Sequence, residues 1–80
     1  MNREEIHIKL NEIFKDVFGD DELVITDDTT AADVDGWDSL QQILLIETVE
    51  NEFHIRFTID EVVSMTNVGD MISKITSKVS

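Results

Sequence analysis

The chain has 80 residues, a formal net charge of −12 and no cysteine. It has room for one small hydrophobic core, and it can form neither a disulfide framework nor a thiolate metal site. No apolar run approaches the ~20 residues of a membrane-spanning helix, and residues 1–5 lack the features of a signal peptide. We therefore expect residues 1–80 to form a single cytoplasmic domain.

The acidic residues are unevenly distributed along the chain. Between residues 16 and 54 there are twelve Asp and Glu residues and no Lys or Arg, whereas six acidic and six basic residues balance each other elsewhere. Such a cluster repels nucleic acid and anionic membranes and attracts proteins that present basic patches. We therefore expect partner enzymes with basic docking patches, and no nucleic-acid or membrane partner.

Residues 2–18 have the pattern of an amphipathic helix. Asn2 and Glu5 have capping-box spacing, and Gly19 fits the C-terminal stop. Apolar residues recur at helical spacing, namely Ile6, Leu10, Ile13, Phe14 and Val17.

Residues 20–37 are predicted to form a long connecting loop. Its apolar residues are expected to hold it against the helices: Leu23, Val24, Ile25, Ala31, Ala32 and Val34. The acidic run inside the loop does not fit a calcium-binding EF-hand, because Ala31 and Gln42 fall where the first and twelfth positions need carboxylates. His7 is expected at the surface or the core edge, and no metal site is expected.

Residues 39–53 form the second predicted helix, with Asp38 as its N-cap. Ser39 then occupies the first helical position, where unpaired N–H groups and the helix dipole favour a phosphate group. No nucleophile elbow surrounds this serine, and no base lies beside it in sequence. We therefore expect Ser39 to be modified by another enzyme rather than to act as a catalytic nucleophile.

The second helix has apolar residues on two sides. Leu45, Ile46, Val49 and Phe53 form a core stripe, whereas Leu40, Ile43 and Leu44 lie largely opposite, with Glu47. Because so small a domain can hardly bury both sides, the second side is predicted to be an exposed docking surface. The alternative is that the loop covers part of it, with Ile43 the first residue to be buried.

Two shorter helices are predicted to close the fold. The second helix should end near Phe53, with His54 in the left-handed conformation. Thr58 and Glu61 have capping-box spacing and open a helix that reaches about Met65. Thr66 or Asn67 caps the last helix, whose apolar stripe consists of Val68, Met71, Ile72, Ile75 and Val79.

Asp38-Ser39-Leu40, followed by Glu-Asn-Glu-Phe at 50–53 and Ile-Arg-Phe at 55–57, resembles the signature and second helix of acyl carrier proteins. The resemblance extends over nearly all 80 residues. It implies an all-α fold, a small four-helix bundle with a long loop between its first two helices, in which three helices are long and one is short. It also implies a carrier, not an enzyme, and we expect a monomer.

The resemblance further implies that a phosphopantetheinyl transferase, using coenzyme A and Mg²⁺, attaches 4′-phosphopantetheine covalently to Ser39. Asp38 would present Ser39 to that enzyme and its metal, and Leu40 would contact it. The arm would then carry acyl groups as thioesters between acyl-transferring or acyl-activating enzymes. The expected docking residues are Leu40, Gln41, Ile43, Leu44 and Glu47.

Two features favour a specialised pathway over bulk fatty-acid synthesis. Common fatty-acid-synthesis carriers tend to have acidic residues where this chain has Gln41 and Leu44. Trp37 completes a Gly-Trp-Asp-Ser-Leu sequence that resembles stand-alone carriers outside bulk fatty-acid synthesis. Two alternatives remain open: an aminoacyl or peptidyl carrier of a dedicated pathway, and an acidic adaptor that is never modified.

Overall fold

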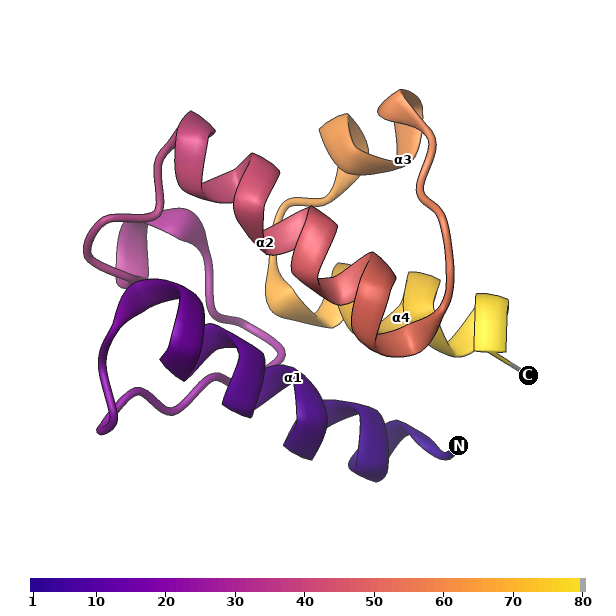
Figure 1. Cartoon of the computed structure of the whole chain (residues 1–80), viewed down its shortest axis with the longest axis horizontal. Coiled ribbons are helices and arrows are strands. Elements are labelled where there is room, and N and C mark those ends of the chain that lie inside the picture. The colour runs from indigo at the N-terminus through magenta and orange to yellow at the C-terminus, as the bar shows by residue number, and fades with distance from the viewer. Residues whose placement is uncertain (80) are drawn as a thin grey trace.

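The computed structural model describes residues 1–79 and shows an all-α fold (Figure 1). Its four α-helices are α1 (Arg3–Phe18), α2 (Ser39–Phe53), α3 (Ile59–Ser64) and α4 (Val68–Val79), and a 3₁₀ helix η1 (Ala31–Asp33) lies in the long loop. The predicted bundle with one short helix is confirmed. Within residues 1–79, no helix is both long and apolar enough to cross a membrane.

The helices begin at the capping side chains that the sequence indicates. Asn2 caps α1 and Thr58 caps α3, and in both cases the glutamate three residues later completes a capping box. At the start of α4, Asn67 Oδ1 accepts the Asp70 N–H at 2.8 Å, so Asn67 is the cap rather than Thr66. Each cap satisfies backbone N–H groups that have no partner within the helix.

The first two helices end in the left-handed conformation. Gly19 ends α1 with φ 63°, as predicted from its lack of a side chain. His54 ends α2 with φ 56° and ψ 47°, and its backbone N–H donates to the Glu50 carbonyl. The prediction for His54 is therefore also confirmed, although a histidine pays a steric cost there that glycine would not.

The core lies between α1, α2 and α4, and α1 packs against both other helices. The three predicted apolar stripes are confirmed. Their buried members are Ile6, Leu10, Ile13 and Phe14 on α1, Leu45, Ile46, Val49 and Phe53 on α2, and Val68, Met71, Ile72 and Ile75 on α4. Val17 and Val79 are only partly buried at the edge of this core.

The long loop is held by fewer apolar residues than predicted. Ile25 and Val34 are buried and Leu23 packs against the core. Val24 is 75% exposed, however, and both alanines at 31 and 32 are exposed. The prediction that these three anchor the loop is wrong. Neighbouring side chains of an extended segment point to opposite sides, so Val24 faces away from the core next to Ile25, and the short η1 leaves both alanines exposed.

Hydrogen bonds from α1 and α4 also hold the long loop against the helices. Asn11 accepts the Ile25 N–H at 2.8 Å and donates to the Leu23 carbonyl at 3.2 Å. The half-buried His7 ring donates through Nε2 to the Ile25 carbonyl, 2.8 Å away. In the middle of the loop, the Thr29 carbonyl accepts the backbone N–H of Val68, the first residue of α4, at 2.9 Å. Together these contacts fix the loop in front of the first turn of α2.

Candidate functional site

Ser39 lies at the first position of α2, and its side chain is exposed. The preceding residue, Asp38, has an extended backbone, and its Oδ1 accepts the Gln41 N–H at 2.9 Å. The N–H groups of Ser39 and Leu40 have no hydrogen-bond acceptor among residues 1–79. The positive end of the helix is therefore open to an anion beside the Ser39 hydroxyl.

An aromatic cluster fixes the chain just before this serine. The Trp37 ring packs edge-on against Phe14 of α1, with centroids 5.2 Å apart and planes at 81°. It also packs against Phe18, at 5.9 Å. Sequence reasoning missed this cluster, although the four-residue spacing of the two phenylalanines places them on one face of α1.

Trp37 is also joined to the first turn of α2 by its polar atom. Its indole Nε1–H donates to Gln42 Oε1 at 2.6 Å. Relative to the cap, Trp37 and Gln42 occupy the two positions at which apolar residues often pack together as a hydrophobic staple. Here a hydrogen bond takes the place of the apolar contact and fixes the angle at which the chain enters α2.

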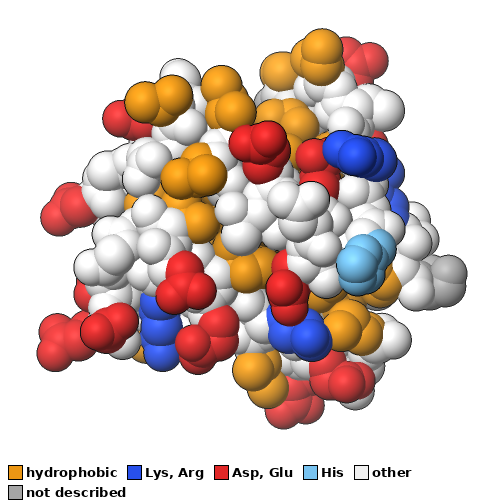
Figure 2. All heavy atoms as spheres, in the orientation of Figure 1, with side chains coloured by type: hydrophobic (Ala, Val, Ile, Leu, Met, Phe, Trp, Pro, Cys, Tyr) orange, Lys and Arg blue, Asp and Glu red, His pale blue; other side chains and the backbone are white. Residues whose placement is uncertain are grey.

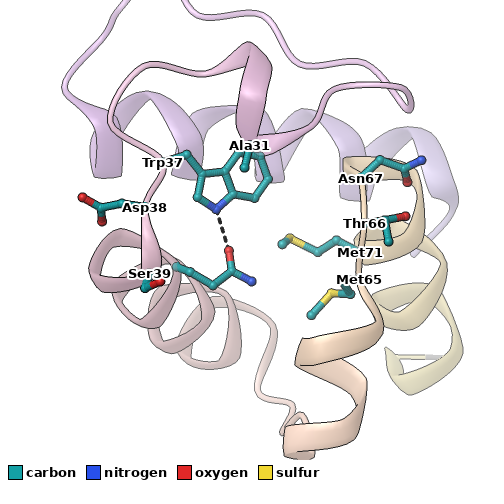
Figure 3. A pocket seen from close by; sticks show the side chains of 9 residues that line it. Ala31, Trp37, Asp38, Ser39, Met65, Thr66, Asn67 and Met71 are labelled. Carbon is teal, nitrogen blue, oxygen red and sulfur yellow. Dashed lines mark hydrogen bonds between the residues drawn. The ribbon is translucent and has the colours of Figure 1, made fainter.

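A cavity of about 340 Å³ opens beside Ser39 (Figure 3). In the figure the indole of Trp37 lies on one side, and the side chains of Met65 and Met71 extend toward it from the other. The lining residues come from the long loop, the first turn of α2, the connection between α3 and α4, and α4 itself. An exposed hydroxyl, an open helix terminus and an adjacent cavity together fit a phosphate-linked group on this serine.

The surroundings of Ser39 do not make it a nucleophile. Among residues 1–79, no hydrogen bond joins its hydroxyl to a histidine or a carboxylate, whereas an activated serine needs an adjacent base. His7 is engaged with the long loop. His54 lies at the opposite end of α2, about 22 Å away along the helix. The arrangement presents Ser39 as a group on which another enzyme can act.

The predicted docking residues of α2 are exposed, with one exception. Leu40, Ile43, Leu44 and Glu47 all lie at the surface. The long loop does not cover Ile43, which is 62% exposed, so the alternative of a buried Ile43 is wrong. Gln41 is half-buried, because its Nε2 donates to the Val17 carbonyl of α1 at 3.3 Å.

Two residues of α3 extend this surface beyond the sequence prediction. Ile59 is 82% exposed and Val63 is 77% exposed. Figure 2 shows apolar side chains over the region of α2 and α3, with acidic side chains among them. Ile59 and Val63 are four residues apart and so lie on one face of α3. The apolar pattern of a six-residue helix is too short to show from the sequence which of its faces is exposed.

Comparisons with known proteins agree with this geometry. The sequence model of the family described as phosphopantetheine attachment site matches residues 9–75. An acyl carrier protein of Thermotoga maritima is 32% identical over 77 residues, covering 96% of this chain and 95% of the relative. An acyl carrier protein of Exiguobacterium sibiricum is 30% identical over 79 residues, covering 99% of this chain and 100% of the relative.

Solved structures give the same result. A holo acyl carrier protein from Geobacter metallireducens matches with a TM-score of 0.88 and 38% identity, over 92% of this chain and 85% of the other. A putative acyl carrier protein from Mycobacterium tuberculosis matches with a TM-score of 0.81 and 25% identity, over 90% of this chain and 96% of the other.

Proposed function

This chain belongs to the acyl carrier protein family, whose members carry 4′-phosphopantetheine, and we propose that Ser39 is the residue to which the arm is attached. The observation that carries the proposal is the exposed Ser39 hydroxyl at the open, positive end of α2. When bound, the arm supplies a thiol that holds an acyl group as a thioester. The chain has no cysteine with which to supply that thiol itself.

Asp38 and Leu40 have separate roles in this proposal. A phosphopantetheinyl transferase and its Mg²⁺ would receive Ser39 in the orientation that the Asp38 cap fixes, while the exposed Leu40 contacts that enzyme. The Ser39 oxygen forms the new phosphodiester bond as the bond to the adenosine half of coenzyme A breaks. In this proposal the transferase accepts the hydroxyl proton, since among residues 1–79 no base is hydrogen-bonded to the Ser39 hydroxyl.

The enzymes that load and unload the arm would dock on the exposed side of α2. Leu40, Ile43 and Leu44 supply apolar contact, Glu47 supplies a charge at the edge, and Ile59 and Val63 continue the surface onto α3. A matching partner has an apolar depression surrounded by basic residues, because rim charges set the association rate and the choice of partner. Gln41 contributes less side-chain surface than its neighbours, since it is half-buried against α1.

The attachment residue is tested by intact mass spectrometry after coexpression with a phosphopantetheinyl transferase. Wild-type protein should gain the mass of one phosphopantetheinyl group, Ser39→Ala should gain nothing, and the matched control Ser64→Ala, at an exposed serine of α3, should load fully. Full loading of Ser39→Ala would show that the arm is attached to another residue. A wild-type protein that never gains mass would favour the unmodified acidic adaptor.

For the pathway, we propose a specialised acyl carrier rather than one of bulk fatty-acid synthesis. Leu44 presents an apolar side chain on the docking surface, and a basic synthase surface would gain more from an acid there. Loaded Leu44→Glu should therefore be elongated several-fold faster than wild type by generic fatty-acid ketosynthases at low salt. Leu44→Gln, which removes the apolar side chain without adding charge, is the control. Equal rates for Leu44→Glu and wild type would remove Leu44 as a specificity element.

A further inference from the structure

The Gln42 carboxamide is held in one orientation at the wall of the cavity beside Ser39. The indole Nε1–H of Trp37 can only donate, so the amide atom that faces it at 2.6 Å must be the acceptor, Oε1. The planar amide then directs Nε2 away from the indole. Within residues 1–79 this nitrogen has no hydrogen-bond acceptor. Every buried side-chain nitrogen or oxygen among those residues does have a partner, so the Gln42 nitrogen is not fully buried and must be reachable by solvent.

Gln42 also lies on the same face of α2 as Ser39. Residues three apart in a helix are neighbours on its surface, and both side chains line the same cavity. A group attached to Ser39 that folds back into this cavity therefore passes the Gln42 amide first.

The Thr66 hydroxyl and the Asn67 oxygen beside the cavity already have hydrogen-bond partners. The Thr66 hydroxyl donates to Asp70 Oδ2 at 2.7 Å, and Asn67 Oδ1 accepts the Asp70 N–H at 2.8 Å. Figure 3 shows the Asn67 nitrogen directed away from the indole side of the cavity. Met65 and Met71 offer no N–H or O–H group. Among the described residues that line the cavity, the Ser39 hydroxyl and Gln42 Nε2 are therefore the side-chain donors that can reach a guest.

We propose that the Trp37–Gln42 pair recognises a carbonyl oxygen of the group carried on Ser39, with Gln42 Nε2 as the hydrogen-bond donor. This inference rests on the proposed function. The acceptor is either an amide carbonyl of the arm or the thioester carbonyl of the acyl cargo, which present the same chemistry. A cavity of about 340 Å³ lies near the lower end of the roughly 300–1,000 Å³ range of ligand sites. The cavity can therefore hold a short segment of the carried group around that carbonyl, but not a long acyl chain.

The pair has a built-in reporter, because Trp37 is the one tryptophan of the chain. Hydrogen bonds in a chain polarise one another, so donation by Gln42 Nε2 strengthens the acceptor character of Oε1 toward the indole. Binding of a carbonyl should therefore change the resonances of both the Gln42 amide and the Trp37 indole N–H.

The test compares four forms of ¹⁵N-labelled protein, each checked by intact mass: apo, holo, butyryl thioester, and a butyl thioether that lacks only the thioester carbonyl. We expect the Gln42 side-chain amide protons to shift downfield on loading, together with the Trp37 indole N–H. A shift confined to the butyryl form identifies the thioester carbonyl. The same shift in all three loaded forms identifies an amide carbonyl of the arm.

Two variants separate donation by Gln42 from general crowding. Gln42→Glu keeps an acceptor for the Trp37 indole but removes the donor, and Gln42→Leu keeps the approximate size without either. In both, the loading-dependent shift of the Trp37 indole N–H should be lost. Unchanged Gln42 resonances in fully loaded wild type, or a wild-type indole shift in loaded Gln42→Glu, would overturn the inference and leave the carrier function intact. Absence of any mass increase would overturn both.

Discussion

Replacing Gly69 with alanine sets two effects of opposite sign against each other. Gly69 has helical backbone near the start of α4, and alanine is favoured over glycine inside a helix by about 0.8–1.0 kcal/mol. A Cβ at this position, however, would lie 3.0 Å from the Asp27 carbonyl oxygen, 3.2 Å from Asp27 Cβ and 3.3 Å from Asn67 Oδ1. Packing therefore opposes the gain in helix propensity.

The nearest of these atoms, the Asp27 carbonyl oxygen, belongs to the backbone that ties the long loop to α4. The Asp27 carbonyl accepts the Gly69 N–H at 2.9 Å, and the Thr29 carbonyl accepts the Val68 N–H at 2.9 Å. A backbone oxygen cannot rotate away from the new methyl group, so the loop must shift and strain both hydrogen bonds. Overpacking costs about 1–3 kcal/mol and a weakened hydrogen bond about 0.5–1.5 kcal/mol. After subtraction of the propensity gain, we expect a net loss of about 2 kcal/mol.

Thermal and urea unfolding followed by circular dichroism measure this loss. For a domain of this size, 1 kcal/mol corresponds to about 4–8 °C in Tm, so Gly69→Ala should melt roughly 10 °C below wild type. Ser73→Ala, at an exposed position of the same helix, adds no crowding and loses only one exposed hydrogen bond, from Arg3 Nη1 to Ser73 Oγ. It should therefore stay within about 1 kcal/mol of wild type. A Gly69→Ala protein that melts at or above the wild-type temperature would refute the packing argument and leave propensity as the larger effect.

Two further predictions concern the end of α2 and the acid limit of stability. His54→Gly should unfold at higher urea than His54→Ala, by about 1 kcal/mol, because glycine has no Cβ penalty in the left-handed conformation; equal midpoints would contradict this. Hydrogen bonds from the Thr58 backbone N–H and the Thr66 hydroxyl, respectively, are the largest causes that lower the pKa of Glu61 and Asp70 below ordinary values of 4.5 and 3.8. The ionised carboxylates therefore stabilise the fold above those values, and this stabilisation is lost as the pH falls through each lowered pKa. Acid titration followed by circular dichroism should show the loss of stability, and Asp70→Asn should make its dependence on pH less steep.

The helices and their stripes could be predicted from the sequence because each signal was local. Asn2, Asp38 and Thr58 cap helices through side chains only three residues from their backbone partners, and the core stripes repeat with the helical period over several turns. The loop could not be predicted in the same way. Val24 and Ile25 look alike in sequence, yet Ile25 is the buried one of the two. Its N–H donates to Asn11 Oδ1 and its carbonyl accepts from His7 Nε2, both on α1.

The candidate site was predictable only in part. The positions of Ser39 and Asp38 followed from capping rules, whereas Ile59 and Val63 lie on a helix too short for its exposed face to be assigned in advance. The Trp37–Gln42 hydrogen bond was missed for a different reason. The staple rule looks for two apolar residues, and a glutamine at the second position does not match that pattern.

The contacts around α2 leave the Ser39 hydroxyl exposed while they hold the neighbouring backbone from several sides. Asp38 caps the helix, Trp37 packs against two rings of α1, Gln41 donates to α1, and Gln42 accepts from Trp37. An arm attached to Ser39, as proposed above, would add its own mobility to that of its base, so a fixed base would limit the volume that the arm must search for a partner's active site. The same contacts couple the site to the core, because Phe14 is both fully buried and in contact with Trp37. Mutations that weaken the packing around Phe14 should therefore increase the mobility of the Ser39 backbone before they unfold the protein.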